Sequence, residues 1–249
     1  MKFLKRPLTI LAFVILLASF LRLYDLGKVP QSLNWDEVSL GYNAYSILKT
    51  GADEYGKALP VVLQSFDDYK PALYTYLAIP TVGLLGLTAQ AVRLPSAFAG
   101  IGAVVIVYFL VLSLLGNKSV NISGREIKPF FIAILASFFL AISPWHIQFS
   151  RIAFESNVGL TINLLGFYLF LKGIKNKYFL PLSFVFFALN IHMYQSDRVF
   201  SPLLAIALCL IFYKKLLASK KVFLLSTICA LIVAMPLIIY ILTNQNALL

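Results

Sequence analysis

The sequence of 249 residues has little charge and few acidic groups. Charged residues make up 12% of the chain, whereas ordinary soluble domains are roughly one-quarter charged. Hydrophobic residues make up 60%, and the mean hydropathy is +0.87. This composition excludes an ordinary soluble globular protein and indicates a polytopic membrane protein.

The sequence is also poor in residues that form disulfides or ligate metals. Its two cysteines, Cys209 and Cys229, both lie inside apolar runs, so no disulfide framework, metal cluster or redox motif is indicated. We expect both to be packing residues. With only two histidines in the chain, a histidine-based metal site is not expected, and we predict no metal-binding residues.

The net charge of +11 raises the question of a nucleic-acid partner. The basic residues, however, occur in short clusters between apolar runs, the pattern by which cytoplasmic loops anchor membrane proteins. We therefore predict membrane lipids, and not nucleic acid, as the partners of these basic clusters.

Apolar runs of spanning or near-spanning length indicate an all-α membrane protein with about seven spanning helices. The first run could be a signal peptide, but no small-x-small cleavage site follows it, and we favour a retained helix. We expect one transmembrane domain over residues 1–249. The chain ends directly after its last run, which suggests either a minimal protein or, as we favour, one truncated at the C-terminus. The runs are 7–21, 94–116, 129–145, 156–171, 178–194, 199–213 and 222–242.

The short apolar segment 71–86 carries Pro80 in its middle. The charges of the loops indicate whether it crosses the membrane. If the segment does not cross the membrane, one side of the protein holds 13 basic residues and one acid, and the other side holds nine of the ten acids with eight basic residues. The positive-inside rule then makes the basic side, with the N-terminus, cytoplasmic. We predict an integral plasma membrane protein with a first outer loop over residues 25–92, in which 71–86 is an interfacial helix.

The outer loop opens with "NWDE", residues 34–37. Polar residues recur after it at helical spacing, which predicts an amphipathic interfacial helix over 36–50. Asn34 and Glu37 have the spacing of a capping box, and Gly51 can end the helix. In one interpretation, Glu37 only caps this helix and Asp36 only complements its dipole.

Further charged residues recur wherever the chain returns to the outer side. Each of the basic residues is, taken singly, typical of a side chain that extends to the membrane interface. Together they indicate a pocket for an anionic lipid phosphate, with a carboxylate placed to take a proton. They are Lys70, Arg93, Arg151, Glu155 and Arg198.

Two neighbouring features have competing interpretations. Aromatic residues of the outer loop, among them Trp35 and Tyr69, can stack on a sugar or belong to an interfacial aromatic belt. Asp67 and Asp68 resemble a metal-binding pair, but we favour a solvated loop.

Six segments in this order resemble the N-terminal membrane half of the polyprenyl-phosphate-sugar glycosyltransferases. The resemblance extends over residues 7–215, to a group in the C-type superfamily that includes protein O-mannosyltransferases and lipid A aminoarabinose transferases. The segments are "NWDE", "TGADEYGKALP", "DDYKPALYTYL", "AVRLPSAFAG", "SPWHIQFSRIAFESN" and "MYQSDRVFSPL".

The resemblance implies catalytic roles for three carboxylates. In such enzymes the first outer loop carries an Asp-Glu pair after the first span, which makes Asp36 the catalytic carboxylate and Glu37 its supporting neighbour. Glu155 falls where many relatives have a second acid, often aspartate. Some superfamily members use a divalent ion and others do not, and the sequence leaves the cofactor undecided.

The resemblance also implies a site for the donor phosphate. Lys70, before Pro71, matches the basic residue that contacts this phosphate in relatives, with Tyr69 beside it. Arg93 matches the arginine that opens the second span. Arg151 precedes the second acid, and Arg198 occupies a place where some relatives use lysine.

The predicted function is transfer of a sugar, with inversion, from a polyprenyl-phosphate donor to a hydroxyl of a protein or lipid-glycan acceptor on the outer face. The alternative is a non-catalytic binder of lipid-linked sugar, or a flippase component, in which the same pocket only binds. A secondary transporter is less favoured, because no paired broken helices occur in corresponding halves. Neutralising the carboxylates distinguishes transfer from binding.

Overall fold

The computed structural model describes residues 2–65, 68–116 and 119–244, and it is mostly helical. The helices are α1 Lys2–Leu23, α2 Trp35–Thr50, α3 Leu73–Leu85, α4 Ala89–Leu115, α5 Pro129–Ile142, α6 Pro144–Ser150, α7 Glu155–Lys175, the 3-10 helix η1 Lys177–Phe179, α8 Leu180–Asn190, α9 Asp197–Ile211, α10 Tyr213–Leu217 and α11 Lys220–Thr243.

Two short antiparallel hairpins correct the all-α prediction. Strand β1 (Val62–Ser65) pairs with β2 (Asp68–Pro71), and β3 (Val120–Ile122) pairs with β4 (Arg125–Ile127). Runs of four and three residues are too short for a pattern of alternating hydrophobicity to distinguish them from loop.

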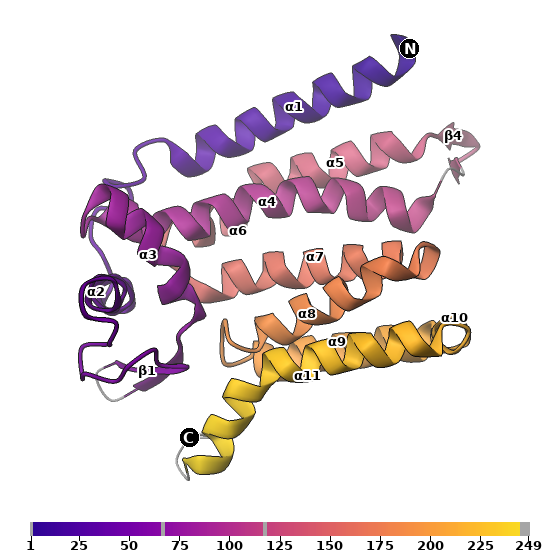
Figure 1. The fold of residues 1–249 in the computed structure, drawn as a ribbon. Helices are drawn as coiled ribbons and strands as arrows, with labels where there is room; N and C mark the ends of the chain where they lie inside the picture. The colour runs from indigo at the N-terminus through magenta and orange to yellow at the C-terminus, as the bar shows by residue number, and fades with distance from the viewer. Residues whose placement is uncertain (1, 66–67, 117–118, 245–249) are drawn as a thin grey trace.

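The long helices lie side by side in a bundle (Figure 1). Helix α4 packs against α5 and α7, α7 against α8, and α8 against α9 and α11. Helices α2 and α3 and the β1 strand gather at one end of this bundle, whereas the N-terminus, β4 and α10 lie at the other (Figure 1). The elements of the predicted outer loop are therefore all at one end.

Within the described residues, three helices are long and apolar enough to cross a membrane: α4, α7 and α11. The predicted run 129–145 corresponds to α5 and the first two residues of α6; the two helices are bent by 61° and count as a fourth candidate span if they are taken together. The bend has a local cause, since Ser143 precedes Pro144 and has an extended conformation, as residues before proline prefer. The structure thus shows a helical membrane protein, and seven spans stay a prediction.

Helix α3 is fixed to the start of α4. The Tyr74 hydroxyl, fully buried, donates to the carbonyl of Val92 at 2.9 Å, and Thr81 Oγ1 donates to the carbonyl of Ala91 at 2.7 Å. Burial raises the pKa of the Tyr74 phenol, and the carboxylate of Glu155 raises it further, so this hydroxyl stays a donor. These bonds hold α3 at the same end of the bundle as α2.

The predicted capping box at the start of α2 is confirmed. The Asn34 side chain accepts from the Glu37 N–H at 2.8 Å, and the Asn34 N–H donates to Glu37 Oε2 at 3.1 Å. Gly51 ends the helix with φ of 74°, a conformation that glycine adopts without steric cost. The box sets where the helix begins and therefore where Asp36 lies.

A buried ion pair joins α2 to α4. The Arg93 Nε–H donates to Glu37 Oε1 at 2.8 Å, and Nη2 donates to Oε2 at 3.1 Å, with both side chains at most 1% exposed. The other guanidinium N–H groups donate to three carbonyls of the segment after α1, those of Leu26, Pro30 and Ser32. All five donors of Arg93 are therefore used.

Arg151 also binds carbonyls at the end of α1 and in the segment after it. Its guanidinium donates to the carbonyls of Leu21, Tyr24 and Val29 at 2.7–2.9 Å. Burial lowers the pKa of Arg151, and the nearby Arg93 lowers it further. The two arginines thus bind backbone carbonyls at the end of α1 and in the segment that follows it. Carbonyls there have no partner within a regular helix, and burying them unpaired is costly.

We predict that residues 71–86 do not cross the membrane, because α2, α3 and the start of α4 share one end of the bundle. In a Cys209→Ser, Cys229→Ser background, Tyr55→Cys and Leu87→Cys should both react with an impermeant thiol reagent in intact cells. Glu126→Cys, in the β3–β4 hairpin, should react only after permeabilisation. Labelling of position 55 but not of 87 in intact cells would show that the segment crosses.

Removing one partner of the buried Arg93–Glu37 pair should strongly destabilise the protein. Arg93→Met leaves the Glu37 carboxylate buried and unpaired, which should lower the free energy of unfolding by about 3–5 kcal/mol. The matched control is Lys28→Ala, because Lys28 pairs with Asp25 at 3.5 Å on the surface, and such pairs contribute about 1 kcal/mol or less. Equal unfolding midpoints of the two purified variants in detergent would contradict the structural role of Arg93.

Candidate functional site

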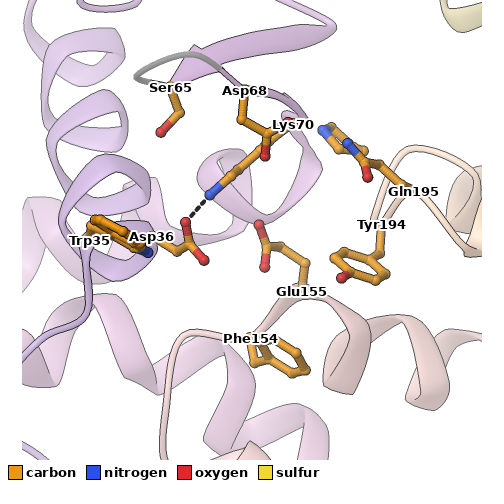
Figure 2. Close-up of a pocket in the computed structure, with 10 residues that line it drawn as sticks. Trp35, Asp36, Ser65, Asp68, Lys70, Phe154, Glu155, Tyr194 and Gln195 are labelled. Atoms are coloured by element: carbon orange, nitrogen blue, oxygen red, sulfur yellow. Dashed lines mark hydrogen bonds and ion pairs between the residues drawn. The ribbon is translucent and has the colours of Figure 1, made fainter. Parts of the chain in front are cut away.

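A pocket of about 710 Å³ lies where α2, the β1–β2 hairpin, the start of α7 and the turn between α8 and α9 meet (Figure 2). It is at the end of the bundle that carries the predicted outer loop. The residues that line it come from four separate parts of the chain: Trp35, Asp36, Ser65, Asp68, Lys70, Pro71, Phe154, Glu155, Tyr194 and Gln195.

An ion pair between Asp36 and Lys70 crosses the pocket (Figure 2). The capping box holds Asp36 in the first turn of α2, and Lys70 is paired with Leu63 across the β1–β2 hairpin. The lysine side chain is 13% exposed, whereas that of Asp36 is 42% exposed. The carboxylate is thus both paired with a cation and open to a ligand in the pocket.

Glu155 brings a second carboxylate to the same space. It is the first residue of α7, is 4% exposed, and its carboxylate lies beside the Asp36–Lys70 pair in Figure 2. The segment leading to it is held by Glu37, whose Oε1 accepts from the Ala153 N–H at 2.9 Å. Glu37 therefore fixes Asp36 through the capping box and Glu155 through Ala153, without lining the pocket itself.

Aromatic and neutral polar groups complete the lining. Trp35 stands at one side and Phe154 and Tyr194 at another (Figure 2). The rings of Phe154 and Tyr194 have centroids 6.1 Å apart. Tyr69 is absent from the lining, but its carbonyl accepts from the Gln195 amide at 3.1 Å, which ties the hairpin to the α8–α9 turn.

Ser65 is a site residue that sequence reasoning did not identify. Its side chain is 2% exposed, and its Oγ has no hydrogen-bond partner within the described part of the chain. Nothing in the local sequence distinguishes it from other loop serines. Only the hairpin register, with Ser65 opposite Asp68, brings its hydroxyl to the pocket near Lys70.

The structure does not bring the predicted arginines to this pocket. Arg93 and Arg151 are occupied by Glu37 and by backbone carbonyls, and partly buried Arg198, in the first turn of α9, lies outside the lining. Among the described lining residues, Lys70 is the single cation, beside the carboxylates of Asp36, Asp68 and Glu155. The pocket is therefore more acidic than the sequence led us to expect.

No group of three or more histidine, cysteine, aspartate or glutamate side chains is arranged to hold a metal ion in the described ranges. Asp68 lines the pocket, whereas Asp67, its partner in the metal-pair interpretation, lies outside the described residues. A combination of one lysine, carboxylates at different depths and neutral polar groups is suited to a ligand that carries both a phosphate and hydroxyl groups.

No family model matches this sequence, and no curated protein sequence matches it. Among solved structures, the fold is similar to the crystal structure of ArnT from Cupriavidus metallidurans bound to undecaprenyl phosphate, with a TM-score of 0.65 and 12% sequence identity. The similarity covers 99% of this chain and 42% of that one, so this chain spans less than half the length of its structural neighbour. At this level of identity, the comparison shows that the chain shares the fold of part of ArnT.

Proposed function

We propose that the chain is a membrane glycosyltransferase, or the donor-binding part of one, that uses a polyprenyl-phosphate-linked sugar. The observation that carries this proposal is the pocket in which Asp36 is paired with Lys70 and Glu155 lies alongside. The fold supports it, since the structural neighbour holds undecaprenyl phosphate, a polyprenyl phosphate. The sugar, the acceptor and the outer-face location of the pocket are parts of the same proposal.

The donor phosphate would bind at Lys70. This lysine lines the pocket and is largely shielded from solvent, so its charge acts in a low-dielectric environment where a phosphate gains most from it. The bundle helices expose many large apolar side chains, which are suited to contact the polyprenyl chain. The donor would then reach the pocket laterally from the bilayer.

Asp36 would act as the general base. As the acceptor hydroxyl attacks the anomeric carbon, its proton passes to Asp36, a bond forms from the acceptor oxygen to this carbon, and the bond from the carbon to the phosphate oxygen breaks. This single displacement inverts the configuration at the anomeric carbon. The polyprenyl phosphate leaves as a stable anion, so no general acid is required, and Lys70 neutralises the charge that develops on it.

The ion pair places the proposed general base next to the proposed phosphate ligand. Before the donor binds, Lys70 is paired with the Asp36 carboxylate at the pocket. A bound phosphate would share the lysine with Asp36 and bring the base within reach of the reacting centre. Glu155, which lines the pocket beside this pair, would accept hydrogen bonds from hydroxyls of the donor sugar.

Asp36→Asn should abolish most transfer while leaving the fold and donor binding intact. Asparagine keeps the size and most of the helix-start character but cannot take the proton, so we expect transfer to fall by about 100-fold or more. The measurement is transfer of radiolabel from polyprenyl-phosphate sugars in membranes that contain the protein.

The matched control for this variant is Asp25→Asn, since Asp25 belongs to the same loop but pairs with Lys28 outside the pocket. If Asp36→Asn retained near-normal transfer in a folded, donor-binding protein, Asp36 would not be the base. A parent protein that binds the donor with no transfer to any acceptor would favour the binder or flippase alternative.

Lys70→Gln should act mainly on the donor. The loss of one hydrogen bond to a charged phosphate should weaken donor binding by about 1.5–3 kcal/mol. Lys49→Gln is the control, because Lys49 is exposed in the last turn of α2, outside the pocket. Unchanged affinity for a polyprenyl phosphate in Lys70→Gln, measured with purified protein, would remove Lys70 from the donor site.

A further inference from the structure

A second pocket, of about 330 Å³, lies at the end of the bundle opposite the candidate site, where the end of α7, η1 and α10 meet. This is the end that the loop charges predict to be cytoplasmic. None of its lining residues lines the first pocket. The proposed transfer reaction therefore does not account for it.

The lining of this pocket is cationic. Lys175, Lys177 and Lys215 line it, all three are exposed residues that a ligand can reach, and no aspartate or glutamate is among its described lining residues. None of the three lysines has an ion-pair partner in the described ranges. After Glu155 the sequence contains a single acid, Asp197, which begins α9 near the other end of the bundle. Cations that share a pocket repel one another, and a bound anion would remove this repulsion.

Neutral polar groups add hydrogen-bond donors to the lysines. Asn176 Oδ1 accepts from the Tyr178 N–H at 3.4 Å, so the amide N–H groups of this asparagine are the part that can donate to a ligand. The hydroxyl of Ser219 is a further possible donor in the lining. Leu180 and Leu216, each 2% exposed, form the apolar part of the lining. The pocket thus combines ammonium, amide and hydroxyl donors, a set that is suited to the oxygens of an anion.

The positive-inside rule alone does not explain this arrangement. The rule counts basic residues near the ends of spans, and Arg125 and Lys128, beside α5, satisfy it as well as the three pocket lysines do. It does not require three lysines to line one cavity. The rule therefore accounts for the side on which the lysines lie, whereas an anionic ligand accounts for their position around one pocket.

We propose that this pocket binds the phosphate headgroup of an anionic glycerophospholipid. Phosphate oxygens accept hydrogen bonds from ammonium, amide and hydroxyl groups, and the bonds between oppositely charged partners are the strong ones. Basic pockets between membrane helices on the cytoplasmic side are suited to such headgroups. A choline headgroup would bring a further cation to the three lysines, so a zwitterionic lipid fits this pocket less well.

Apolar side chains beside the pocket favour a lipid over a soluble phosphate. Tyr178 lines the pocket, is 77% exposed, and has its ring centroid 5.8 Å from Lys177 Nζ. Phe179 and Leu217, which are next in sequence to lining residues, are 38% and 51% exposed. Acyl chains can contact these side chains while the phosphate meets the lysines. A soluble phosphate would leave the exposed apolar side chains without a role.

Native mass spectrometry of the purified chain in detergent tests the proposal, because it counts bound molecules at each ligand concentration. The protein is titrated with phosphatidic acid, with phosphatidylcholine and with glycerol 3-phosphate. We expect phosphatidic acid to bind with a Kd at least about fivefold lower than either of the others, the effect expected of about one lysine near a lipid phosphate. Lys70→Gln should keep this binding, which separates it from any binding of the lipid at the candidate site.

Two double variants separate a defined site from general attraction by the basic end of the protein. Lys175→Gln with Lys215→Gln changes exposed side chains of the lining and should raise the Kd for phosphatidic acid at least about fivefold. Arg125→Gln with Lys128→Gln removes the same charge from the same end, outside the lining, and should leave this Kd nearly unchanged. Equal losses in the two double variants would overturn the proposal, because the summed charge alone would then explain binding. Equal affinity of the parent protein for phosphatidylcholine or for glycerol 3-phosphate would overturn it as well.

Discussion

The ion pair between Arg93 and Glu37 is the interaction on which the geometry of the candidate site depends. Through its five donors Arg93 binds α2 and three carbonyls of the loop after α1, and through Glu37 it reaches the Ala153 N–H. Asp36 is one residue from this pair, and Glu155 is two residues from Ala153. Two carboxylates that are far apart in the sequence thus share one buried anchor. Because burying two charges is costly, we interpret the pair as a device for positioning rather than for net stability.

The same end of the protein shows why cations near a membrane interface need not bind a ligand. The chain leaves regular helix after α1, and its carbonyls must be satisfied where little water is present. Arg93 and Arg151 perform this task, and Arg22 does so for the carbonyls of Leu140 and Ala141. Lys70 differs, because it is on strand β2 at the end of the bundle and its ammonium faces the pocket. The donor site proposed here therefore depends on one lysine instead of a ring of arginines.

Much of the local structure could be predicted from the sequence. Asn34, Glu37 and Gly51 form the capping motifs expected of their spacing, and the helices α2 and α3 occupy the segments 36–50 and 71–86 to within a few residues. The short helix α6 was not predicted, because most of it lies beyond the apolar run 129–145. The partners of Arg93 could not be predicted, since they belong to segments more than 30 residues away in the sequence. The position of Ser65 could not be predicted either, since it depends on the register of a very short hairpin. The sequence identifies which charges are present, but only the packing distinguishes a buried arginine from an available one.

The most direct test is a crystal structure of the protein with an undecaprenyl phosphorothioate, whose sulfur can be located by its anomalous signal. We expect the phosphorothioate within hydrogen-bonding distance of Lys70 Nζ, beside the Asp36 carboxylate, with Arg93 and Arg151 still bound to Glu37 and to the carbonyls they contact now. A headgroup bound at Arg93, Arg151 or Arg198, with Lys70 and Asp36 undisturbed, would contradict the proposed site.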